Sequence, residues 1–189
     1  MIRGELFFFK SKYVWRLRDR HLQPGYPALA SRHWWAIPDH IDAGFEDSAG
    51  NFWFFQGFSY WIYDGENQVS GPKLLSELGL SAGEVQAALM WGLEQNKKIY
   101  FFKGSDYWRF NMEKGGVALD SAYPRSIMDW RGIPAHIDGA FEDQYGYAYF
   151  LRGRYYWKFD PVQVKVQEGY PRLIGHDFFG CTSSPQPYT

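Results

Sequence analysis

Phe-Phe-Lys-Gly-Ser-Asp-Tyr-Trp, at residues 101–108, is one of four related segments that decide the fold of this chain. The others are Phe-Phe-Lys-Ser-Lys-Tyr-Val-Trp at 8–15, Phe-Phe-Gln-Gly-Phe-Ser-Tyr-Trp at 54–61 and Phe-Leu-Arg-Gly-Arg-Tyr-Tyr-Trp at 150–157. Their final tryptophans are 46, 47 and 49 residues apart (61−15, 108−61 and 157−108). Repeats of about this period are typical of propeller blades. Four such units account for the whole chain of 189 residues.

Each repeat is predicted to be an antiparallel meander. The aromatic segment indicates two strands joined by a turn, which contains Gly57, Gly104 or Gly153 in three of the copies. Three copies also have a lead segment upstream, at 41–47, 85–89 and 137–143. The small residues of the lead suit an innermost strand near a central axis, whereas the aromatic residues fill the space between neighbouring sheets. One short helix is expected at residues 72–79, between two blades.

The repeats also divide the chain. The propeller is expected at residues 1–181, with a partial first blade at 1–38 and further blades at 39–81, 82–134 and 135–181. Tyr-Pro recurs late in three of these units, at 26–27, 123–124 and 170–171. Residues 182–189 are rich in proline and serine and are predicted to be a disordered tail.

Composition excludes several classes of protein. Aromatic residues make up 21% of the chain and are spread along its length, which indicates a repetitive core. The formal net charge of −1 argues against nucleic acid as a partner. No stretch reaches the roughly 20 apolar residues of a membrane span, and the first residues lack the apolar core of a signal peptide, so any targeting signal is expected outside this sequence. The single cysteine, Cys181, excludes an internal disulfide and a C-x-x-C site.

Longer segments carry a family resemblance. They are residues 2–10, 22–34, 147–153 and 177–181, together with the recurring Ile-Asp-Ala or Ile-Asp-Gly, Phe-Glu-Asp and Phe-Phe-x-Gly-x-x-Tyr-Trp patterns. This sequence resembles the hemopexin repeat from one end to the other. Within that family it is similar to the hemopexin-like domains of secreted matrix metalloproteinases, in particular those of the stromelysin type. The resemblance implies an all-β, four-bladed β-propeller that binds other molecules and is not itself catalytic.

The first repeat departs from the family pattern. It begins at its second strand, so the first blade is expected to lack its innermost strand. The resemblance also implies a disulfide between Cys181 and a cysteine that precedes that strand, and this partner is absent from the chain. Ring closure is therefore expected to be weaker than is usual in the family.

The resemblance implies an ion in the central channel, held by backbone carbonyls at the start of each innermost strand. The residues concerned are Asp42, Gln86 and Asp138, with Gly44, Ala88 and Ala140 lining a second layer. Calcium, a hard cation that favours oxygen ligands, is the expected structural ion, and sodium or chloride would be alternatives. Because the first inner strand is missing, so is the fourth ligand, and the channel could be unoccupied in this chain. The competing interpretation is that Asp42 and Asp138 only cap the ends of strands.

No catalytic residue is predicted. The zinc-protease motif His-Glu-x-x-His is absent, so zinc is expected only in a separate catalytic domain. The five histidines have no metal-binding spacing, and His40 and His136 share one repeat position in a loop. The pairs Glu46-Asp47 and Glu142-Asp143 recur with the repeat, so strand-end and turn roles are expected for them instead of acid and base catalysis.

Charge is distributed unevenly along the chain. Residues 1–38 carry seven Lys or Arg and two acidic side chains, whereas residues 39–80 carry one Lys and seven acidic ones. Arg16, Arg18 and Arg20 alternate, so in an extended strand they would share one face. This face is a candidate patch for sulfated glycosaminoglycan or an acidic protein surface. The alternative is an ordinary solvated outer strand.

The resemblance implies that the chain is the non-catalytic C-terminal domain of a secreted zinc-dependent matrix metalloendopeptidase of the extracellular matrix. The resemblance implies that this domain docks protein substrates, tissue inhibitors of metalloproteinases, matrix components or glycosaminoglycan. A separate domain would carry out the proteolysis, including collagen catabolism. The alternative is a haem-binding or matrix-adhesion protein of the hemopexin and vitronectin type.

Overall fold

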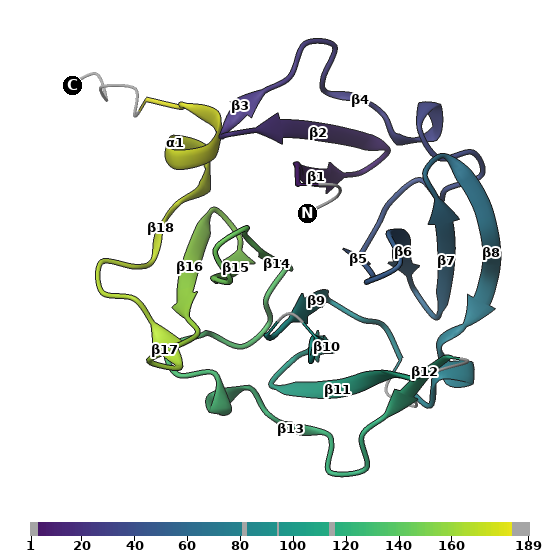
Figure 1. Ribbon diagram of the computed structural model, residues 1–189. Helices are drawn as coiled ribbons and strands as arrows, with labels where there is room; N and C mark the ends of the chain where they lie inside the picture. The colour runs from purple at the N-terminus through teal and green to yellow at the C-terminus, as the bar shows by residue number, and fades with distance from the viewer. Residues whose placement is uncertain (1–3, 81–82, 94, 114–115, 183–189) are drawn as a thin grey trace.

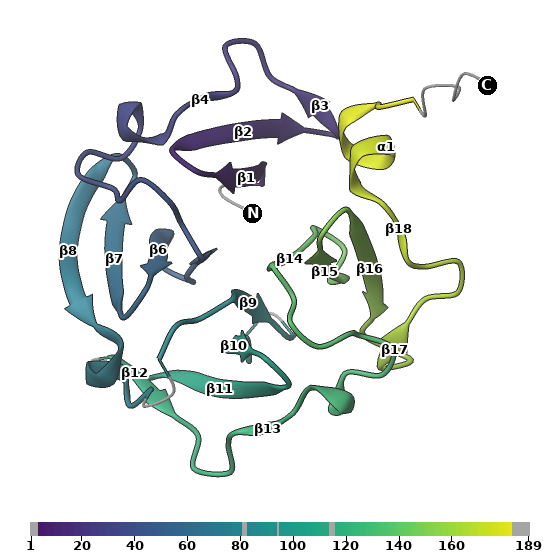
Figure 2. The ribbon, with the colours of Figure 1, turned by 180° about the vertical axis from the view of Figure 1, so that it is seen from behind.

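The structure is a computed structural model that describes residues 4–80, 83–93, 95–113 and 116–182. Four antiparallel sheets are arranged around a central axis as the blades of a propeller (Figure 1). Seen from behind, the ring has β1 near the axis and α1 at the rim (Figure 2). The predicted all-β, four-bladed propeller is therefore confirmed. Residues 183–189 of the predicted disordered tail lie outside the described residues.

Three blades have the same strand order from the axis outward. Blade 2 is formed by β5 (Ala43–Glu46), β6 (Asn51–Gln56), β7 (Ser59–Asp64) and β8 (Asn67–Leu74). Blade 3 is formed by β9 (Ala87–Trp91), β10 (Lys98–Lys103), β11 (Asp106–Glu113) and β12 (Gly116–Leu119). Blade 4 is formed by β14 (Gly139–Glu142), β15 (Ala148–Arg152), β16 (Tyr155–Asp160) and β17 (Lys165–Val166). The lead segments of the sequence thus become the innermost strands β5, β9 and β14.

The first blade begins one strand later. Its strands are β1 (Leu6–Lys10), β2 (Tyr13–Arg18) and β3 (His21–Leu22). The repeat aligns β1 with β6, β10 and β15, which are the second strands of their blades. Among the described residues β1 pairs only with β2, from Leu6↔Leu17 to Lys10↔Tyr13. Within the described residues, as predicted, blade 1 has no strand on the axial side of β1.

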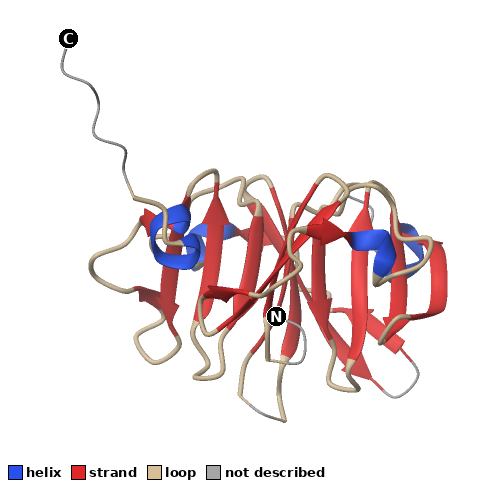
Figure 3. Ribbon diagram, turned by 90° about the horizontal axis from the view of Figure 1, so that it is seen from above, coloured by secondary structure: helices blue, strands red, loops and turns tan. Residues whose placement is uncertain are grey.

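Short strands and helical turns connect the blades along the rim (Figure 3). Three two-residue strands follow cis Tyr-Pro bonds and pair with the third strand of their blade: β4 (Ala28–Leu29), β13 (Arg125–Ser126) and β18 (Arg172–Leu173). Helical segments come next, as 3₁₀ helices at Ala30–Arg32 and Ile127–Asp129 and as α1 (Ile174–Phe179).

The helix expected at residues 72–79 is shorter than predicted. A 3₁₀ helix spans Leu75–Leu78 and ends at Gly79, which has a φ of 83°. Pro72 belongs instead to β8, because Lys73 and Leu74 pair with β7. The end of β8 thus takes the place that β4, β13 and β18 have in the other blades.

The repeated aromatic pair joins each blade to the next. The second residue of one pair meets the first residue of the next pair edge to face. The distances between ring centroids are 5.5 Å for Phe9 and Phe54, 5.0 Å for Phe55 and Phe101, and 5.5 Å for Phe102 and Phe150. Such contacts are each worth about 0.5–1.5 kcal/mol beyond the apolar area that they bury.

Blade 4 closes the ring in a different way, because its pair ends in Leu151 instead of a second phenylalanine. Helix α1 supplies the aromatic rings at this junction. Phe178 and Phe179 lie 5.9 and 5.3 Å from Phe8 of β1, measured between ring centroids. Phe178 is buried and also contacts Tyr156 of blade 4. Packing of α1 on the first blade therefore links the last blade to the first.

We expect Phe178→Ala to lower the free energy of unfolding by about 3–5 kcal/mol, as is usual when a buried phenylalanine is truncated. The truncation leaves a cavity at the junction of blades 4 and 1. Chemical denaturation followed by tryptophan fluorescence measures the loss. Val162→Ala is the control, because Val162 is 88% exposed and its truncation should change stability by less than about 0.5 kcal/mol. An equally small effect of Phe178→Ala would show that α1 does not close the ring.

Candidate functional site: the central channel and the first blade

A cavity of about 730 Å³ lies at the centre of the ring, beside β1. Its walls are formed by β1, by the start of the inner strands of blades 2 and 4, and by α1. Five of the six residues predicted to surround a channel ion are in these walls, namely Asp42, Gly44, Ala88, Asp138 and Ala140. Gln86 is not among them. The cavity thus combines the axial channel with the space beside β1 where the other blades have an inner strand.

The side chains that begin the inner strands share a structural role. Each accepts a hydrogen bond from the N–H of the glycine in the turn between the second and third strands. The pairs are Asp42 Oδ2 with Gly57 at 2.8 Å, Gln86 Oε1 with Gly104 at 2.7 Å, and Asp138 Oδ2 with Gly153 at 2.5 Å. The three glycines have φ values of 57–58°, which suit a residue without a side chain. Each acceptor therefore fastens an inner strand to the hairpin beside it, which is the strand-capping role that was the alternative to ion binding.

The hydrogen bonds to the turn glycines decide which atoms of Asp42, Gln86 and Asp138 could still bind a channel ion. Among the residues that the structure describes, no three His, Cys, Asp or Glu side chains are grouped as metal ligands. Because a turn glycine engages each side chain, the backbone carbonyls are the donors that Asp42, Gln86 and Asp138 have in common. Carbonyl oxygen is a ligand that calcium accepts, so an ion at this place would be held by main-chain groups, and Asp42 and Asp138 are the two of these residues that line the cavity. The ion itself stays a prediction.

The recurring Glu-Asp pairs have the turn roles that the sequence predicts. Asp47 is buried, and its carboxylate accepts hydrogen bonds at 2.9 Å from the N–H groups of Ala49 and Asn51 and from Trp53 Nε1. The carboxylate of Asp143 accepts from Tyr145 N, Tyr147 N and the Tyr149 hydroxyl at 2.8, 3.1 and 2.9 Å. Both carboxylates fold the turn that follows an inner strand.

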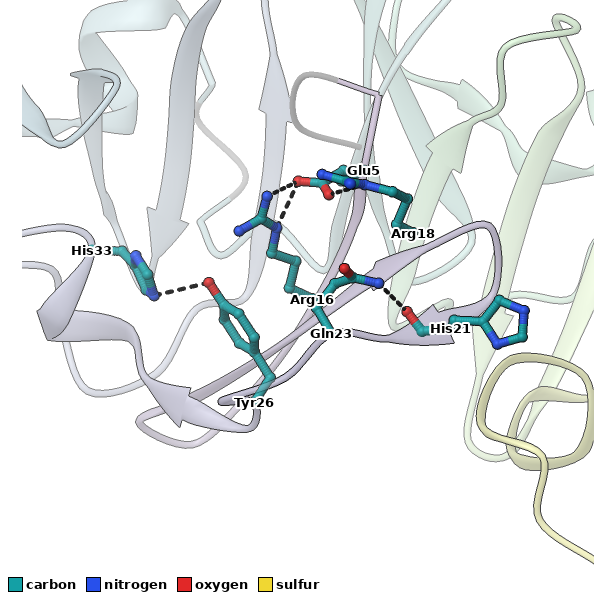
Figure 4. Close-up of polar contacts among 7 residues, drawn as sticks. All are labelled: Glu5, Arg16, Arg18, His21, Gln23, Tyr26 and His33. Atoms are coloured by element: carbon teal, nitrogen blue, oxygen red, sulfur yellow. Dashed lines mark hydrogen bonds and ion pairs between the residues drawn. The ribbon is translucent and has the colours of Figure 1, made fainter.

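Arg16 and Arg18 lie on one face of β2, as predicted, but Glu5 lies between them (Figure 4). The Nε atoms of Arg16 and Arg18 donate to Glu5 at 2.6 and 2.8 Å. Burial acts to raise the pKa of Glu5, but the hydrogen bonds from the two guanidinium groups outweigh it and hold that pKa below its usual range. Glu5 is therefore ionised at neutral pH and offsets part of the positive charge. Sequence reasoning missed this pairing, because it joins the residue that precedes β1 to two residues of β2.

Arg20 does not share that face, and the prediction is wrong for this residue. The strand ends at Arg18, and Arg20 has a φ of 62° beyond it. Its guanidinium carbon lies 5.0 Å from the centre of the Phe178 ring. Arg20 thus covers the junction with α1, and the candidate anion patch rests on Arg16 and Arg18.

Two further features concern the sequence predictions. Cys181 is a free, exposed thiol just after α1, and its N–H donates to the carbonyl of Gly175 at 3.0 Å. Within the described ranges, no helix has the length and apolar character needed to cross a membrane.

Comparison with known proteins identifies a family and several relatives. A family model described as Hemopexin matches residues 1–39, 41–82, 85–135 and 137–181. The chain is 60% identical over 183 residues to stromelysin-3 of Xenopus laevis and 64% identical over 180 residues to stromelysin-3 of Homo sapiens. It is 35% identical over 190 residues to matrix metalloproteinase-2 of Drosophila melanogaster. These matches cover 97%, 95% and 97% of the chain but only 38%, 36% and 24% of the curated relatives.

Solved structures share the fold. The hemopexin fold protein CP4 from cow pea has a TM-score of 0.75 at 22% sequence identity, with 93% of this chain and 90% of that chain covered. The seed albumin LS24 from Lathyrus sativus has a TM-score of 0.76 at 16% identity, with 93% and 89% covered. At these identities the likeness concerns the fold alone.

We expect Glu5→Gln to increase retention on a heparin column, because Arg16 and Arg18 then present their full charge. The variant should also be less stable than the wild type at pH 7. Since the pKa of Glu5 is lowered in the fold, its contribution is complete above the ordinary value of 4.5 and is lost as pH falls through the lowered value. The stability difference between variant and wild type should therefore shrink below about pH 4.5.

Glu168→Gln is the matched control, since it removes the same charge from an exposed position in blade 4. Retention that rises equally in both variants would attribute the effect to net charge. Such a result would contradict an anion patch on β2.

Proposed function

The chain belongs to the hemopexin family, and on this basis we propose that it is the non-catalytic C-terminal domain of a secreted zinc-dependent matrix metalloendopeptidase. A separate domain of the parent protein would cut peptide bonds. This chain would dock protein substrates, tissue inhibitors of metalloproteinases or components of the extracellular matrix. Cys181 would form a disulfide with a cysteine outside this chain.

One observation carries the proposal. The identity to stromelysin-3 is 60–64% and extends over 95–97% of the chain. The relatives are far longer than this chain, which spans little more than a third of the two stromelysin-3 proteins. The chain itself has no His-Glu-x-x-His motif to hold a catalytic zinc ion. A docking role beside a catalytic domain accounts for both facts.

The distribution of side chains supports a binding role. The repeated aromatic residues are buried between the blades, whereas large apolar side chains outside that pattern are exposed. Trp35, Met128 and Tyr145 are 78%, 82% and 74% exposed, and each lies in a connection between strands. Tryptophan, tyrosine and methionine are enriched where proteins contact one another. The buried pattern fixes the blades, so the connections are free to provide contacts.

The test compares the parent proteinase with and without this domain on two substrates. We expect deletion to lower kcat/KM at least about tenfold for an intact matrix protein and to change it less than about twofold for a short peptide. The reason is that only a large substrate reaches beyond the catalytic domain. The separate 189-residue chain, added in excess, should inhibit cleavage of the matrix protein alone.

Two outcomes would contradict the docking role. Equal losses on both substrates would mean that the domain supports the catalytic domain instead of the substrate. An unchanged rate on the matrix protein would mean that it contributes no contact. Trp35→Ala in the parent protein, beside Val162→Ala, then tests whether the exposed tryptophan is part of the docking surface.

We also propose that calcium binds in the central channel. The backbone carbonyls of Asp42, Gln86 and Asp138 would hold it, and Gly44, Ala88 and Ala140 would surround a second position, where sodium or chloride could bind. Zinc would be confined to the catalytic domain. Calcium would link the three inner strands β5, β9 and β14 near the axis.

Calcium should therefore raise the melting temperature of the chain, in proportion to the logarithm of its concentration once it exceeds the Kd. Isothermal calorimetry gives the Kd. In Gln86→Ala the carbonyl remains while the hydrogen bond to Gly104 is lost, so the variant should melt lower without calcium yet retain calcium affinity within about threefold. Loss of calcium binding in Gln86→Ala would assign the ligand to the side chain, and no heat in the wild type would contradict the channel site.

A further inference from the structure

The tips of the hairpins between the second and third strands differ in charge from blade to blade. Because the repeat runs in the same direction in every blade, these tips lie at one end of the blades. Their sequences are Lys-Ser-Lys-Tyr at 10–13, Gln-Gly-Phe-Ser at 56–59, Lys-Gly-Ser-Asp at 103–106 and Arg-Gly-Arg-Tyr at 152–155. Blades 1 and 4, which are neighbours in the ring (Figure 1), have two cationic side chains each. Blade 2 has none, and in blade 3 Lys103 is directly opposite Asp106.

The basic side chains of these two tips are exposed, and none has an ion pair within the described residues. They are Lys10, Lys12, Arg152 and Arg154. The face of β2 is different, since Glu5 binds both Arg16 and Arg18 there. At the blade 4 tip the carboxylate of Asp138 accepts from the N–H of Gly153. The two tips therefore keep most of their positive charge, whereas Glu5 offsets half of the charge on β2.

Each of the two tips also presents a tyrosine ring. The first cation of the tip lies directly opposite the tyrosine in the strand register, so the two side chains share one face of the sheet. The second cation lies over the ring, with 5.8 Å from Lys12 Nζ to the centre of Tyr13 and 5.3 Å from Arg154 Cζ to the centre of Tyr155. Tyr13 and Tyr155 are 41% and 38% exposed. Solvent thus reaches an aromatic surface and two cations at each tip.

Hydrogen bonds hold the backbone of both tips. The carbonyl of Lys12 accepts from the N–H of Ala30, and the carbonyl of Arg154 accepts from the N–H of Ile174, each at 2.9 Å. Ile174 begins α1, and the helix ends at Phe179, which packs on Phe8 of β1. A helix of six residues is about 9 Å long. Helix α1 therefore holds the blade 4 tip and the first blade in a fixed relation.

We propose that the two tips together form a binding site for a sulfated polysaccharide, which lies across blades 4 and 1. Lys10, Lys12, Arg152 and Arg154 would bind its sulfate groups, because guanidinium and ammonium groups form charge-assisted hydrogen bonds with oxyanions. The rings of Tyr13 and Tyr155 would contact the apolar faces of the sugar rings. This site is separate from the face of β2 and from the central channel.

The chemistry of the tips favours a polysaccharide over a protein. Neither tip has an aliphatic side chain, whereas the centre of a protein interface is apolar and well packed. A linear polymer carries sulfate groups at regular intervals, so one chain can reach both tips at once. Binding at the second tip is then intramolecular and raises the overall affinity. The proposal names one class of matrix component for the docking role, but it concerns the chain alone and needs no protease.

The test uses the whole chain and a heparin octasaccharide, with calorimetry at low ionic strength. We expect one octasaccharide to bind per chain, with an affinity that falls as salt screens the exposed charges. Lys12→Gln combined with Arg154→Gln should lower the affinity at least about tenfold, because each tip loses one of its two cations. No measurable binding by the wild type would overturn the proposal.

Arg131→Gln combined with Lys165→Gln is the matched control. It also removes one arginine and one lysine, both exposed, and Lys165 pairs with Asp160 at the end of β16 opposite to the tip. The control should change the affinity less than about twofold, because these charges are remote from the site. Equal losses in the two double variants, with each shown to be folded by its melting curve, would attribute binding to net charge and contradict the site.

A pair of single variants separates the tips from the face of β2. Arg154→Gln should weaken octasaccharide binding at least about threefold, whereas Arg18→Gln, whose guanidinium is already engaged by Glu5, should weaken it less than about twofold. A larger loss in Arg18→Gln would place the octasaccharide on β2, and the proposal would be wrong.

Two control ligands test the chemistry of the partner. The fully desulfated octasaccharide should not bind, because the cations then have no sulfate to bind. A glutamate peptide with the same number of negative charges should not displace the sulfated octasaccharide at equal concentration. If the desulfated sugar binds as tightly, or if the peptide displaces the octasaccharide, the tips do not recognise a sulfated polysaccharide. Each of these results would leave protease docking untouched, because no measurement involves the catalytic domain.

Discussion

Edge-to-face contact between phenylalanine rings of neighbouring blades is the interaction on which the rest of this structure depends. A single four-stranded blade has two faces and can bury neither alone, so its stability comes from the blades beside it. The ring pairs Phe55–Phe101 and Phe102–Phe150 are 99–100% buried. Because each repeat contributes one ring to the preceding junction and one to the next, a single sequence pattern builds successive junctions of the propeller.

The same dependence explains where the fold is weakest. The pattern has a leucine at Leu151, so the last junction lacks the ring that the others have. In the part of the chain that the structure describes, no strand lies on the axial side of β1 at that junction. Helix α1 compensates on the outside through Phe178 and Phe179, and the inside remains a cavity of about 730 Å³.

The sequence predicted the features that recur in every repeat, but not the contacts that a single repeat makes through its tertiary structure. The blades, the inner strands and the turn glycines follow from spacing and from small residues, which act locally. Glu5 lies between Arg16 and Arg18 because β1 and β2 pair, and Arg20 leaves that face because the strand ends at Arg18.

Helical segments were harder to predict for a related reason. Pro72 and Gly79 flank a stretch that the sequence indicates as one helix, yet its first three residues belong to β8, of which Lys73 and Leu74 pair with β7. Helix α1 has six residues, and no side chain caps its N-terminus. Its position is set instead by the packing of Phe178 against Phe8. Where tertiary contacts decide, local propensity is a weak guide.

The side chain that precedes each inner strand follows directly from the repeat. It has to place one oxygen atom opposite the N–H of the turn glycine, and Gln86 does this with Oε1 where the other two blades use the carboxylates of Asp42 and Asp138. Glutamine can therefore replace aspartate at this position without altering the blade.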